Sequence, residues 1–143
     1  MSLLDKPRTF LNKRLLGGDH EARACKFLRQ RGLRLIKSNF HCRRGEIDLI
    51  MQGSDNTIVF IEVRYRKSSD YGMAIETVDR HKQDRIRMSA ALFLQSNYAY
   101  SKLNCRFDVV GISPLPSPLG SSSRYRDSYC RKFEIDWVQN AFY

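Results

Sequence analysis

Two short apolar segments joined by a turn constrain the fold of this chain most strongly. Residues 45–50 (Gly-Glu-Ile-Asp-Leu-Ile) and 58–64 (Ile-Val-Phe-Ile-Glu-Val-Arg) are rich in β-branched and apolar residues, which is typical of strands. Residues 52–57 between them, Gln-Gly-Ser-Asp-Asn-Thr, are turn formers. The whole stretch is therefore predicted to form an antiparallel β-hairpin, and the rest of the fold has to be built around it.

The register of this hairpin follows from the place of its turn. A turn centred on Asp55 makes the numbers of facing residues sum to 110, so that Asp48 faces Glu62 and Glu46 faces Arg64. A slip of one residue would move every apolar side chain to the other face of the sheet. We therefore take this register as the working hypothesis.

Asp48 and Glu62 form a candidate metal site in this register. Side chains alternate along a strand, so Ile47, Leu49 and Met51 are predicted to share the face opposite Asp48. Two neighbouring carboxylates repel each other unless a positive group lies between them. Mg²⁺ or Mn²⁺ would serve, because hard cations prefer oxygen ligands. The alternative is a surface pair neutralised by arginine, but the strongly apolar strands favour a site.

The same residues carry a family resemblance. The pattern Gly-Glu-Ile-Asp-Leu-Ile, followed by Val-Phe-Ile-Glu-Val-basic-Tyr-Arg, resembles the YraN-like family of small bacterial proteins. That family is similar to the restriction-endonuclease-like superfamily, whose nuclease motif is Asp…Glu-x-Lys. The resemblance covers roughly Gly17 to Ile112. Further matching positions are Glu21-Ala22-Arg23-Ala24, Asn39, Lys82, Arg106-Phe107-Asp108-Val109-Val110 and, beyond that range, Ala141-Phe142.

The resemblance implies roles for five residues of this chain. Asp48 and Glu62 would hold Mg²⁺ or Mn²⁺, and Glu21, on the first helix, would be an auxiliary metal ligand. Lys82 matches a lysine of the family, and Arg64 stands where the nuclease motif usually has lysine. The implied catalytic set is therefore Asp48, Glu62, Arg64 and Lys82. For Glu21 the alternative is a carboxylate that only stabilises a helix N-terminus.

The order of predicted elements indicates an α/β fold. The resemblance implies a restriction-endonuclease-like core, a mixed central β-sheet flanked by helices. The predicted elements are a helix from Asp19 that stops near Gly32, a strand at 33–40, the hairpin, a helix at 77–95, and strands at 105–112 and 131–137.

The chain of 143 residues is long enough for one domain with a real core. Residues 1–16 are predicted to be a basic N-terminal arm, and residues 17–143 a single endonuclease-like domain. Within this domain the Pro/Ser-rich residues 113–123 are predicted to be a mobile loop.

The charge of the chain favours a polyanionic partner. The formal net charge is +10, from 25 basic and 15 acidic residues, so nucleic acid is the first candidate. A basic protein without such a partner is the alternative. Arginine suits phosphate because its planar fork donates two hydrogen bonds at once. The candidate nucleic-acid-binding residues are Arg43, Arg44, Arg66, Lys67 and Lys82.

Residues 65–72, Tyr-Arg-Lys-Ser-Ser-Asp-Tyr-Gly, interleave basic and aromatic side chains. Such a stretch can hold a phosphate backbone while its rings stack on unpaired bases. The alternative is that Tyr65 and Tyr71 pack beneath the loop.

No segment indicates export or membrane insertion. Residues 1–8 contain no apolar run long enough for a signal peptide. The longest clean apolar strand, residues 58–61, is far too short to span a bilayer. We therefore expect a cytoplasmic protein without a membrane partner.

Taken together, these patterns indicate a nucleic-acid-binding protein. The resemblance implies a metal-dependent endonuclease acting on DNA, and its likeness to junction-resolving nucleases suggests branched or structured DNA. Two alternatives stay open: a non-catalytic binding module on a decayed nuclease fold, and a protein-interaction scaffold. Arg64 motivates the first of these, because arginine is effectively never deprotonated and differs in shape from lysine.

Overall fold

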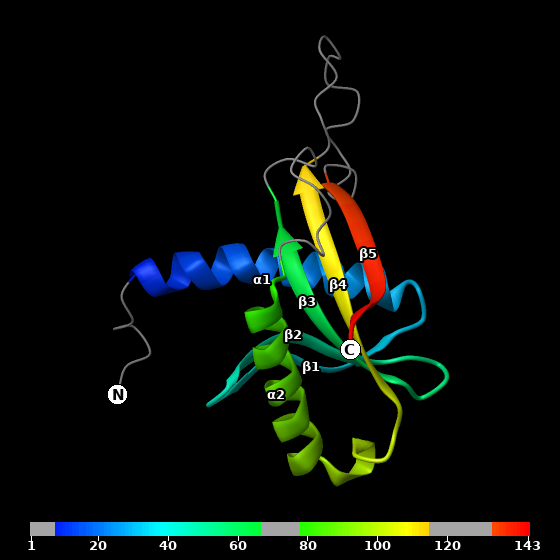
Figure 1. Ribbon diagram of the computed structural model, residues 1–143. Coiled ribbons are helices and arrows are strands. Elements are labelled where there is room, and N and C mark those ends of the chain that lie inside the picture. Colours follow the sequence, from blue (N-terminus) through cyan, green and yellow to red (C-terminus); the bar gives the residue numbers. More distant parts are fainter. Residues whose placement is uncertain (1–7, 67–77, 115–132) are drawn as a thin grey trace, which may run out of the picture.

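The computed structural model describes residues 8–66, 78–114 and 133–143, with side chains from Asp19 onward. The predictions for residues 1–7, Lys67, Tyr71 and residues 115–123 lie outside the described residues. The helices and strands labelled in Figure 1 are α1 (Arg8–Arg29), β1 (Arg34–Cys42), β2 (Gly45–Gln52), β3 (Ile58–Tyr65), α2 (Arg80–Ser96), β4 (Cys105–Pro114) and β5 (Phe133–Phe142). A 3-10 turn, η3 (Tyr98–Tyr100), follows α2.

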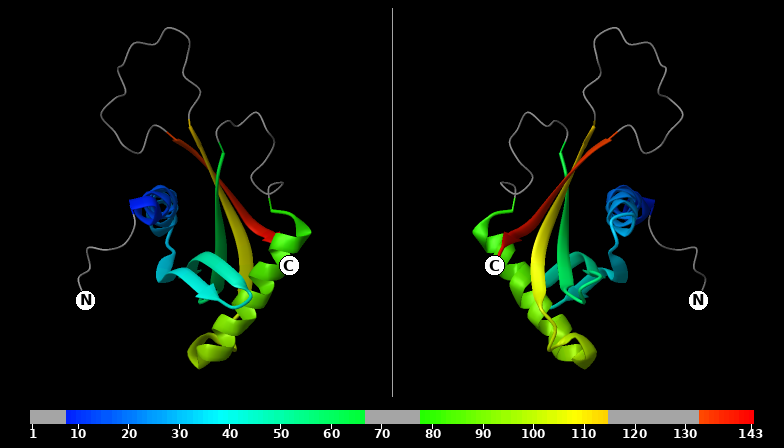
Figure 2. Two further views of the ribbon diagram at one scale, coloured as in Figure 1. Left: turned by 90° about the vertical axis from the view of Figure 1, so that its left-hand side faces the viewer. Right: turned by 90° about the vertical axis from the view of Figure 1, so that its right-hand side faces the viewer.

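The strands form one five-stranded sheet in the order β1-β2-β3-β4-β5. β3 and β4 run parallel, and the other neighbours are antiparallel. A parallel pair needs a crossover connection, and α2 lies within the one between β3 and β4. α1 covers one face of the sheet and α2 the other (Figure 2). The predicted α/β fold, a mixed sheet flanked by helices, is confirmed and is compatible with a restriction-endonuclease-like core.

Each helix buries its own apolar cluster against the sheet. Phe60 on β3 packs with Ile86 and Phe93 on the α2 side. Leu28 of α1 packs with Ile61 on the other side. α2 buries one face at helical spacing, which consists of Ile86, Ser89, Ala90 and Phe93. No helix in the described part of the chain is long and apolar enough to cross a bilayer.

α1 begins earlier than the sequence pattern predicted. Its backbone is helical from Arg8, not from Asp19, so residues 8–16 of the expected arm belong to a helix. The helix continues through Gly17 and Gly18, where a glycine costs only about 1 kcal/mol relative to alanine. The predicted stop is confirmed, because α1 ends at Arg29 and Gly32 follows with φ +93°.

The hairpin register is confirmed where β2 and β3 pair. Leu49 pairs with Ile61, and the ladder runs to Gln52 opposite Ile58, so facing numbers sum to 110. This ladder ends at Leu49 and Ile61, which leaves Asp48 and Glu62 just beyond its last pair. The two strands therefore form a fork, and the predicted acids stand where it opens.

The prediction that Ile47 shares a face with Leu49 and Met51 is wrong. Ile47 packs in the α2-side cluster, whereas Leu49 and Met51 pack on the α1 side. The alternation breaks at the level of Asp48, where β2 leaves β3. Opposite Asp48 in β1, Asn39 has φ +52°, a left-handed conformation that bends the strand. A strand that is distorted on one side and unpaired on the other is free to twist.

β5 is also longer than predicted, because it continues past Trp137 to Phe142. The added residues follow a register shift between Phe107 and Val109 of β4. Asp108, at that shift, is fully buried and accepts hydrogen bonds from Trp137 Nε1 (2.9 Å) and from the Asn140 backbone N–H (3.0 Å). Arg106 Nε lies 3.1 Å from the same carboxylate. Asp108 therefore has a structural role, since its carboxylate connects β4 to β5.

Candidate active site

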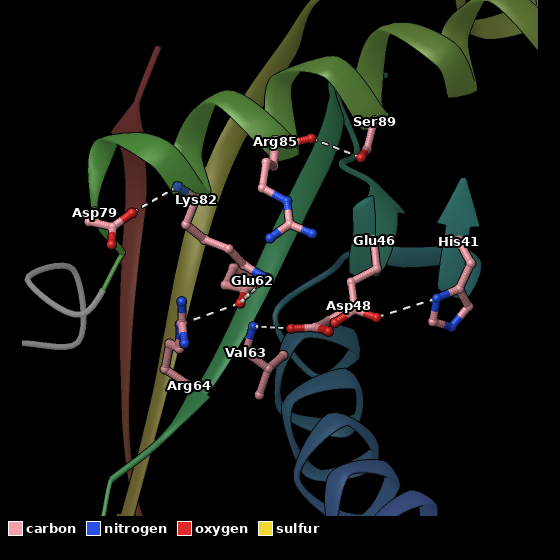
Figure 3. Close-up of polar contacts among 10 residues, drawn as sticks. All are labelled: His41, Glu46, Asp48, Glu62, Val63, Arg64, Asp79, Lys82, Arg85 and Ser89. Carbon is pink, nitrogen blue, oxygen red and sulfur yellow. Dashed lines mark hydrogen bonds and ion pairs between the residues drawn. The ribbon is translucent and has the colours of Figure 1, made fainter. Parts of the chain in front are cut away.

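The site is built at the fork between β2 and β3. Asp48 occupies the position at which the ladder would have continued, and its Oδ2 accepts a 2.8 Å hydrogen bond from the Val63 backbone N–H (Figure 3). A backbone donor that would otherwise be left unpaired at the end of the ladder is thus satisfied by a side chain. This bond sets the orientation of the Asp48 carboxyl next to Glu62.

Three carboxyl groups from three elements meet here. Asp48 of β2 shares side-chain hydrogen bonds with Glu62 of β3 and with Glu21 of α1. The side chain of Asn39 also hydrogen-bonds Glu21. The left-handed Asn39 thereby links the distorted strand β1 to the site. The structure thus brings the predicted metal ligands Glu21, Asp48 and Glu62 together.

The electrostatics of this cluster favour bound protons in the absence of a cation. Burial, followed by the charge of Asp48, raises the pKa of Glu62 to about 7. Burial and Asp48 likewise raise the pKa of Glu21 to about 7. Burial also raises the pKa of Asp48, although the Val63 hydrogen bond and the charge of Lys82 oppose this shift. The three carboxyls therefore share protons near neutral pH, as closely spaced acids do.

The donor atoms suit a hard divalent cation. Within the described part of the chain, Oε2 of Glu21 and Oε2 of Glu62 are buried and have no hydrogen-bond partner. Carboxylate oxygens are the preferred ligands of Mg²⁺ and Mn²⁺. In the arrangement seen here, no three His, Cys, Asp or Glu side chains of the described residues are grouped so as to hold a metal ion. The carboxyls are joined by hydrogen bonds instead, so a cation would have to replace their protons and turn the side chains.

Two cations flank the buried glutamate. Glu62 Oε1 lies 3.3 Å from Arg64 Nε and 3.5 Å from Lys82 Nζ (Figure 3). Lys82 is placed by the start of α2, where Asp79 caps the helix by accepting a 2.8 Å hydrogen bond from the Lys82 backbone N–H. A positive side chain near a helix N-terminus is unfavourable by itself. The acid cluster in front of Lys82 offsets this cost.

The expected partnership of Glu46 with Arg64 is not found. Arg64 pairs with Glu62, and Glu46 pairs across the β1–β2 ladder with His41, at 3.3 Å between Oε2 and Nδ1. The reason is the fork, since β2 and β3 no longer face each other at this level.

A polar cavity of about 370 Å³ lies on the α2 side of the carboxyls, lined by His41, Gly45, Glu46, Lys82 and Arg85. Gly45, with φ +153°, lets the hairpin approach α2 closely. A Cβ atom there would come within 3.3 Å of Ser89 Oγ and 3.6 Å of Arg85 Cβ. Figure 3 shows the Arg85 guanidinium directed from α2 toward the carboxyls. Two cationic side chains thus line a space next to the acids.

Sequence reasoning noted Arg85 only as one of several basic residues on its helix. It noted Asn39 only as a matching family position. The contact between α2 and the hairpin that gives Arg85 its place leaves no periodic signal in the sequence. The glycine at position 45 is the one local hint of that contact.

Of the candidate phosphate contacts in the described residues, Lys82 is the one that lines this cavity. Arg43 and Arg44 are exposed in the turn between β1 and β2. Arg66 directly follows β3, and its backbone N–H donates to Ile112 O at 2.8 Å. Among the described residues, Nε and Nη1 of Arg66 are buried and find no hydrogen-bond partner. The remaining candidate, Lys67, lies outside the described residues.

The α1 side of the fork carries an aromatic pair. The His20 ring stacks on the Tyr65 ring, with centroids 4.1 Å apart. Burial, together with the charge of Arg23, lowers the pKa of His20, so its ring is neutral near pH 7. An aromatic surface thus lies next to Glu21 in the chain.

Comparison with known proteins places this site within a matched segment. Residues 20–112, which include Glu21, Asp48, Glu62 and Lys82, match the family described as "Uncharacterised protein family UPF0102". The chain is 42% identical over 132 residues to a UPF0102 protein of Alcanivorax borkumensis (strain SK2), covering 92% of this chain and 94% of that protein. It is 41% identical over 126 residues to a UPF0102 protein of Pseudomonas syringae pv. tomato, covering 88% and 91%. A UPF0102 protein of Pseudomonas aeruginosa (strain LESB58) is 42% identical over 126 residues, covering 88% and 90%.

Proposed function

The chain belongs to the uncharacterised protein family UPF0102, and from its carboxyl cluster we propose that it binds nucleic acid and cleaves phosphodiester bonds with the help of Mg²⁺ or Mn²⁺. The observation that carries this proposal is the meeting of Glu21, Asp48 and Glu62 at the fork, next to Lys82 and Arg64. Carboxylates beside cations are what metal-assisted phosphodiester hydrolysis needs.

Glu21, Asp48 and Glu62 would hold the metal ion. Their donor set consists of oxygen atoms alone, and two of these atoms are buried without a hydrogen-bond partner among the described residues. When bound, the ion lowers the pKa of a coordinated water and offsets negative charge on the phosphate. The pKa values of Glu21 and Glu62 are raised only to about 7, so at a working pH near neutral the expulsion of their protons costs little.

The side chains around the acids prepare the site for a phosphate. Val63 holds the Asp48 carboxyl through its backbone N–H, and Asn39 holds Glu21. The ammonium of Lys82 and the guanidinium of Arg64 would stabilise negative charge that develops on the phosphate in the transition state. Lys82 and Arg64 are thus already in place for a phosphate, whereas the carboxyls have to turn when a metal ion replaces their protons.

The basic groups around the cavity support binding to a nucleic-acid backbone. Lys82 and Arg85 on α2 line the cavity beside the acids, and Arg43 and Arg44 lie exposed in the turn that precedes its lining residue Gly45. Arg66 adds buried donors next to β3, and Lys67 follows it in the chain. The net charge of +10 suits the same partner. We propose DNA as the substrate, with branched or structured forms implied by the family resemblance, and the cytoplasm as the place of action.

A second function is favoured by one observation, the arginine at position 64. In the nuclease motif a lysine stands there, whereas here the Arg64 Nε lies 3.3 Å from Glu62 and keeps its charge at all relevant pH values. A module that binds nucleic acid without cleaving it would have such a site. The position of Lys82 favours the enzyme, because its ammonium reaches the same carboxylate from α2.

The test uses labelled single-stranded, duplex and branched DNA, with and without Mn²⁺. The wild type should retain DNA at low salt and cleave it only with the metal. Asp48→Asn should still bind but not cleave, because its amide oxygen can accept the Val63 hydrogen bond but carries no charge. Binding without cleavage by the wild type would favour the module. Failure to retain any DNA would exclude both functions, and cleavage by Asp48→Asn would exclude this site.

A further inference from the structure

An aromatic pair lies directly beside the acid fork, on the α1 side of the sheet. Tyr65, the last residue of β3, stacks its ring on that of His20, with centroids 4.1 Å apart and planes inclined by 12°. Tyr65 is nevertheless 44% exposed, although β3 is buried from Ile58 to Glu62. His20 therefore covers one face of the Tyr65 ring, and the exposed part of the residue lies outside this contact.

The pair is held in place from behind. The Phe133 ring meets His20 edge-on, with centroids 6.2 Å apart and an interplanar angle of 76°. Residues from α1, β3 and β5 thus fix the orientation of the exposed tyrosine. A ring that is already ordered loses little conformational entropy when another ring stacks on it.

The aromatic pair lies close to the carboxyl-bearing residues along the chain. His20 precedes Glu21 in α1. Tyr65 comes two residues after Val63, whose N–H binds Asp48. Two residues of a strand span about 6.6 Å, which is comparable to one nucleotide step of an extended single strand. A nucleotide next to the one whose phosphate lies at the acids would therefore reach the tyrosine.

The residues on either side of Tyr65 supply the complementary charge. Arg64 and Arg66 flank it in the chain, and two guanidinium nitrogens of Arg66 are buried without a hydrogen-bond partner in the described part of the molecule. Proteins that bind single strands combine basic groups along the backbone with aromatic rings under the bases. At the end of β3 Tyr65 provides the ring, and Arg64, which lies with Glu62 on the opposite face of the strand, provides a basic group next to it in the chain.

We propose that the Tyr65–His20 pair is a stacking platform for an unpaired nucleobase adjacent to the phosphodiester at the carboxyl site. A base within a duplex has both faces covered by its neighbours, so only a single strand, or the single-stranded part of a branched substrate, can use the platform. This inference rests on the proposed function and adds the strandedness of its substrate. The recognised group is the unpaired base, which DNA and RNA share.

The experiment places the fluorescent base 2-aminopurine at successive positions of a short DNA strand. The full-length protein is titrated into this strand without divalent metal, and separately into the same strand annealed to its complement. The wild type should bind the single strand more tightly and quench 2-aminopurine at one or two positions only. An RNA strand of the same sequence should show the same dependence on Tyr65.

Three variants separate stacking from packing. Tyr65→Leu should weaken single-strand binding roughly 5- to 150-fold and abolish the quenching, while duplex binding stays unchanged. Tyr65→Phe keeps the ring and should behave as the wild type. Tyr98→Leu is the matched control, because Tyr98 is 76% exposed but lies on η3, beyond the far end of α2 (Figure 1).

A folded Tyr65→Leu variant that binds and quenches like the wild type would overturn the platform and leave the proposed function standing. Equal losses for single strand and duplex would also overturn it, because they indicate a packing role. If Tyr65→Leu does not fold, the wild type and Tyr65→Phe decide, and the absence of a quenched position in both overturns the inference. If the wild type binds neither strand nor duplex, the proposed function fails as well.

Discussion

The ammonium of Lys82 lies 3.5 Å from the carboxylate of Glu62, which connects the start of α2 with the end of β3. The Glu-x-Lys motif of the nuclease superfamily that this sequence resembles would supply the cation from the same strand as the glutamate, but here Arg64 occupies that position. The structure thus has an ammonium at the acids even though the motif position holds arginine.

The first prediction concerns the source of the catalytic cation. Lys82→Ala should lower metal-dependent cleavage by about 100-fold or more, because a preorganised group that stabilises transition-state charge is lost. Arg64→Lys should be neutral or harmful, since the ammonium is already supplied from α2. Single-turnover cleavage of labelled DNA measures both. Faster cleavage by Arg64→Lys than by the wild type would show instead that the site is a weakened Glu-x-Lys centre.

The second prediction concerns binding to the nucleic-acid backbone. Replacing Arg43, Arg44 and Lys82 together by alanine should weaken binding to DNA of any sequence. The slope of log affinity against log salt concentration should fall by roughly one for each lost phosphate contact. Fluorescence anisotropy over a salt series measures this slope.

The control for this prediction removes the same charge elsewhere. Arg29, Lys37 and Lys102 are exposed, and none of them belongs to the turn that carries Arg43 and Arg44 or to the cavity lining. If their triple alanine variant loses as much affinity as the variant of Arg43, Arg44 and Lys82, the binding follows net charge and not this surface.

The third prediction concerns Gly45, which brings the hairpin against α2. Gly45→Ala should destabilise the protein by roughly 1–3 kcal/mol, because φ is +153° and the new methyl group would meet Ser89 Oγ at 3.3 Å. It should also weaken DNA binding, because Arg85 is displaced from the cavity. Gly32→Ala is the control, since Gly32 has φ +93° but nothing within 4 Å of an added Cβ. Urea unfolding and anisotropy should show both losses for Gly45→Ala and only a loss of stability for Gly32→Ala.

The hairpin shows how much of the structure local sequence patterns predict. The turn residues and the two apolar runs predicted a register that the pairs from Leu49–Ile61 to Gln52–Ile58 confirm. The same reasoning put Asp48 and Glu62 together, and they do meet. It could not predict that the ladder stops one pair earlier, because this depends on the distortion at Asn39 and on α1 packing beneath.

The remaining differences have similar causes. Glu46 pairs with His41 because the fork separates it from Arg64, and no pattern within β2 or β3 encodes that separation. α1 begins at Arg8 because two glycines are tolerated within a helix, although they are typical of its end. The cavity depends on a contact between residues far apart in the sequence, Gly45 and Ser89. Contacts of this kind arise from tertiary packing, and the periodicity of the sequence does not predict them.

The fourth prediction concerns pH without metal. The pKa of Glu62 is raised from 4.5 to about 7 in the folded protein, and that of Glu21 likewise. Between these pH values the folded state binds more protons at these groups than the unfolded state does. Their contribution to the free energy of unfolding is therefore full below pH 4.5 and is lost as the pH rises toward 7.

Urea unfolding between pH 4.5 and 8 tests this dependence. Glu62→Gln should flatten the pH profile by roughly 1–3 kcal/mol over this range, because its amide cannot titrate. Glu134→Gln is the control, since Glu134 is an exposed carboxylate on β5 and its replacement should leave the profile unchanged. If Glu62→Gln has the same pH profile as the wild type, the conclusion that the carboxyls share protons is wrong.

Calorimetric titration of Mn²⁺ into the protein at pH 6.5 shows whether the three carboxyls form a divalent-metal site. The titration is done in two buffers with different heats of ionisation. The wild type should bind one ion or more, and the measured heat should differ between the buffers, because the metal displaces protons from the carboxyls. Asp48→Asn should bind far more weakly. Absence of Mn²⁺ binding by the wild type at millimolar concentration, or equal binding by Asp48→Asn, would contradict the account.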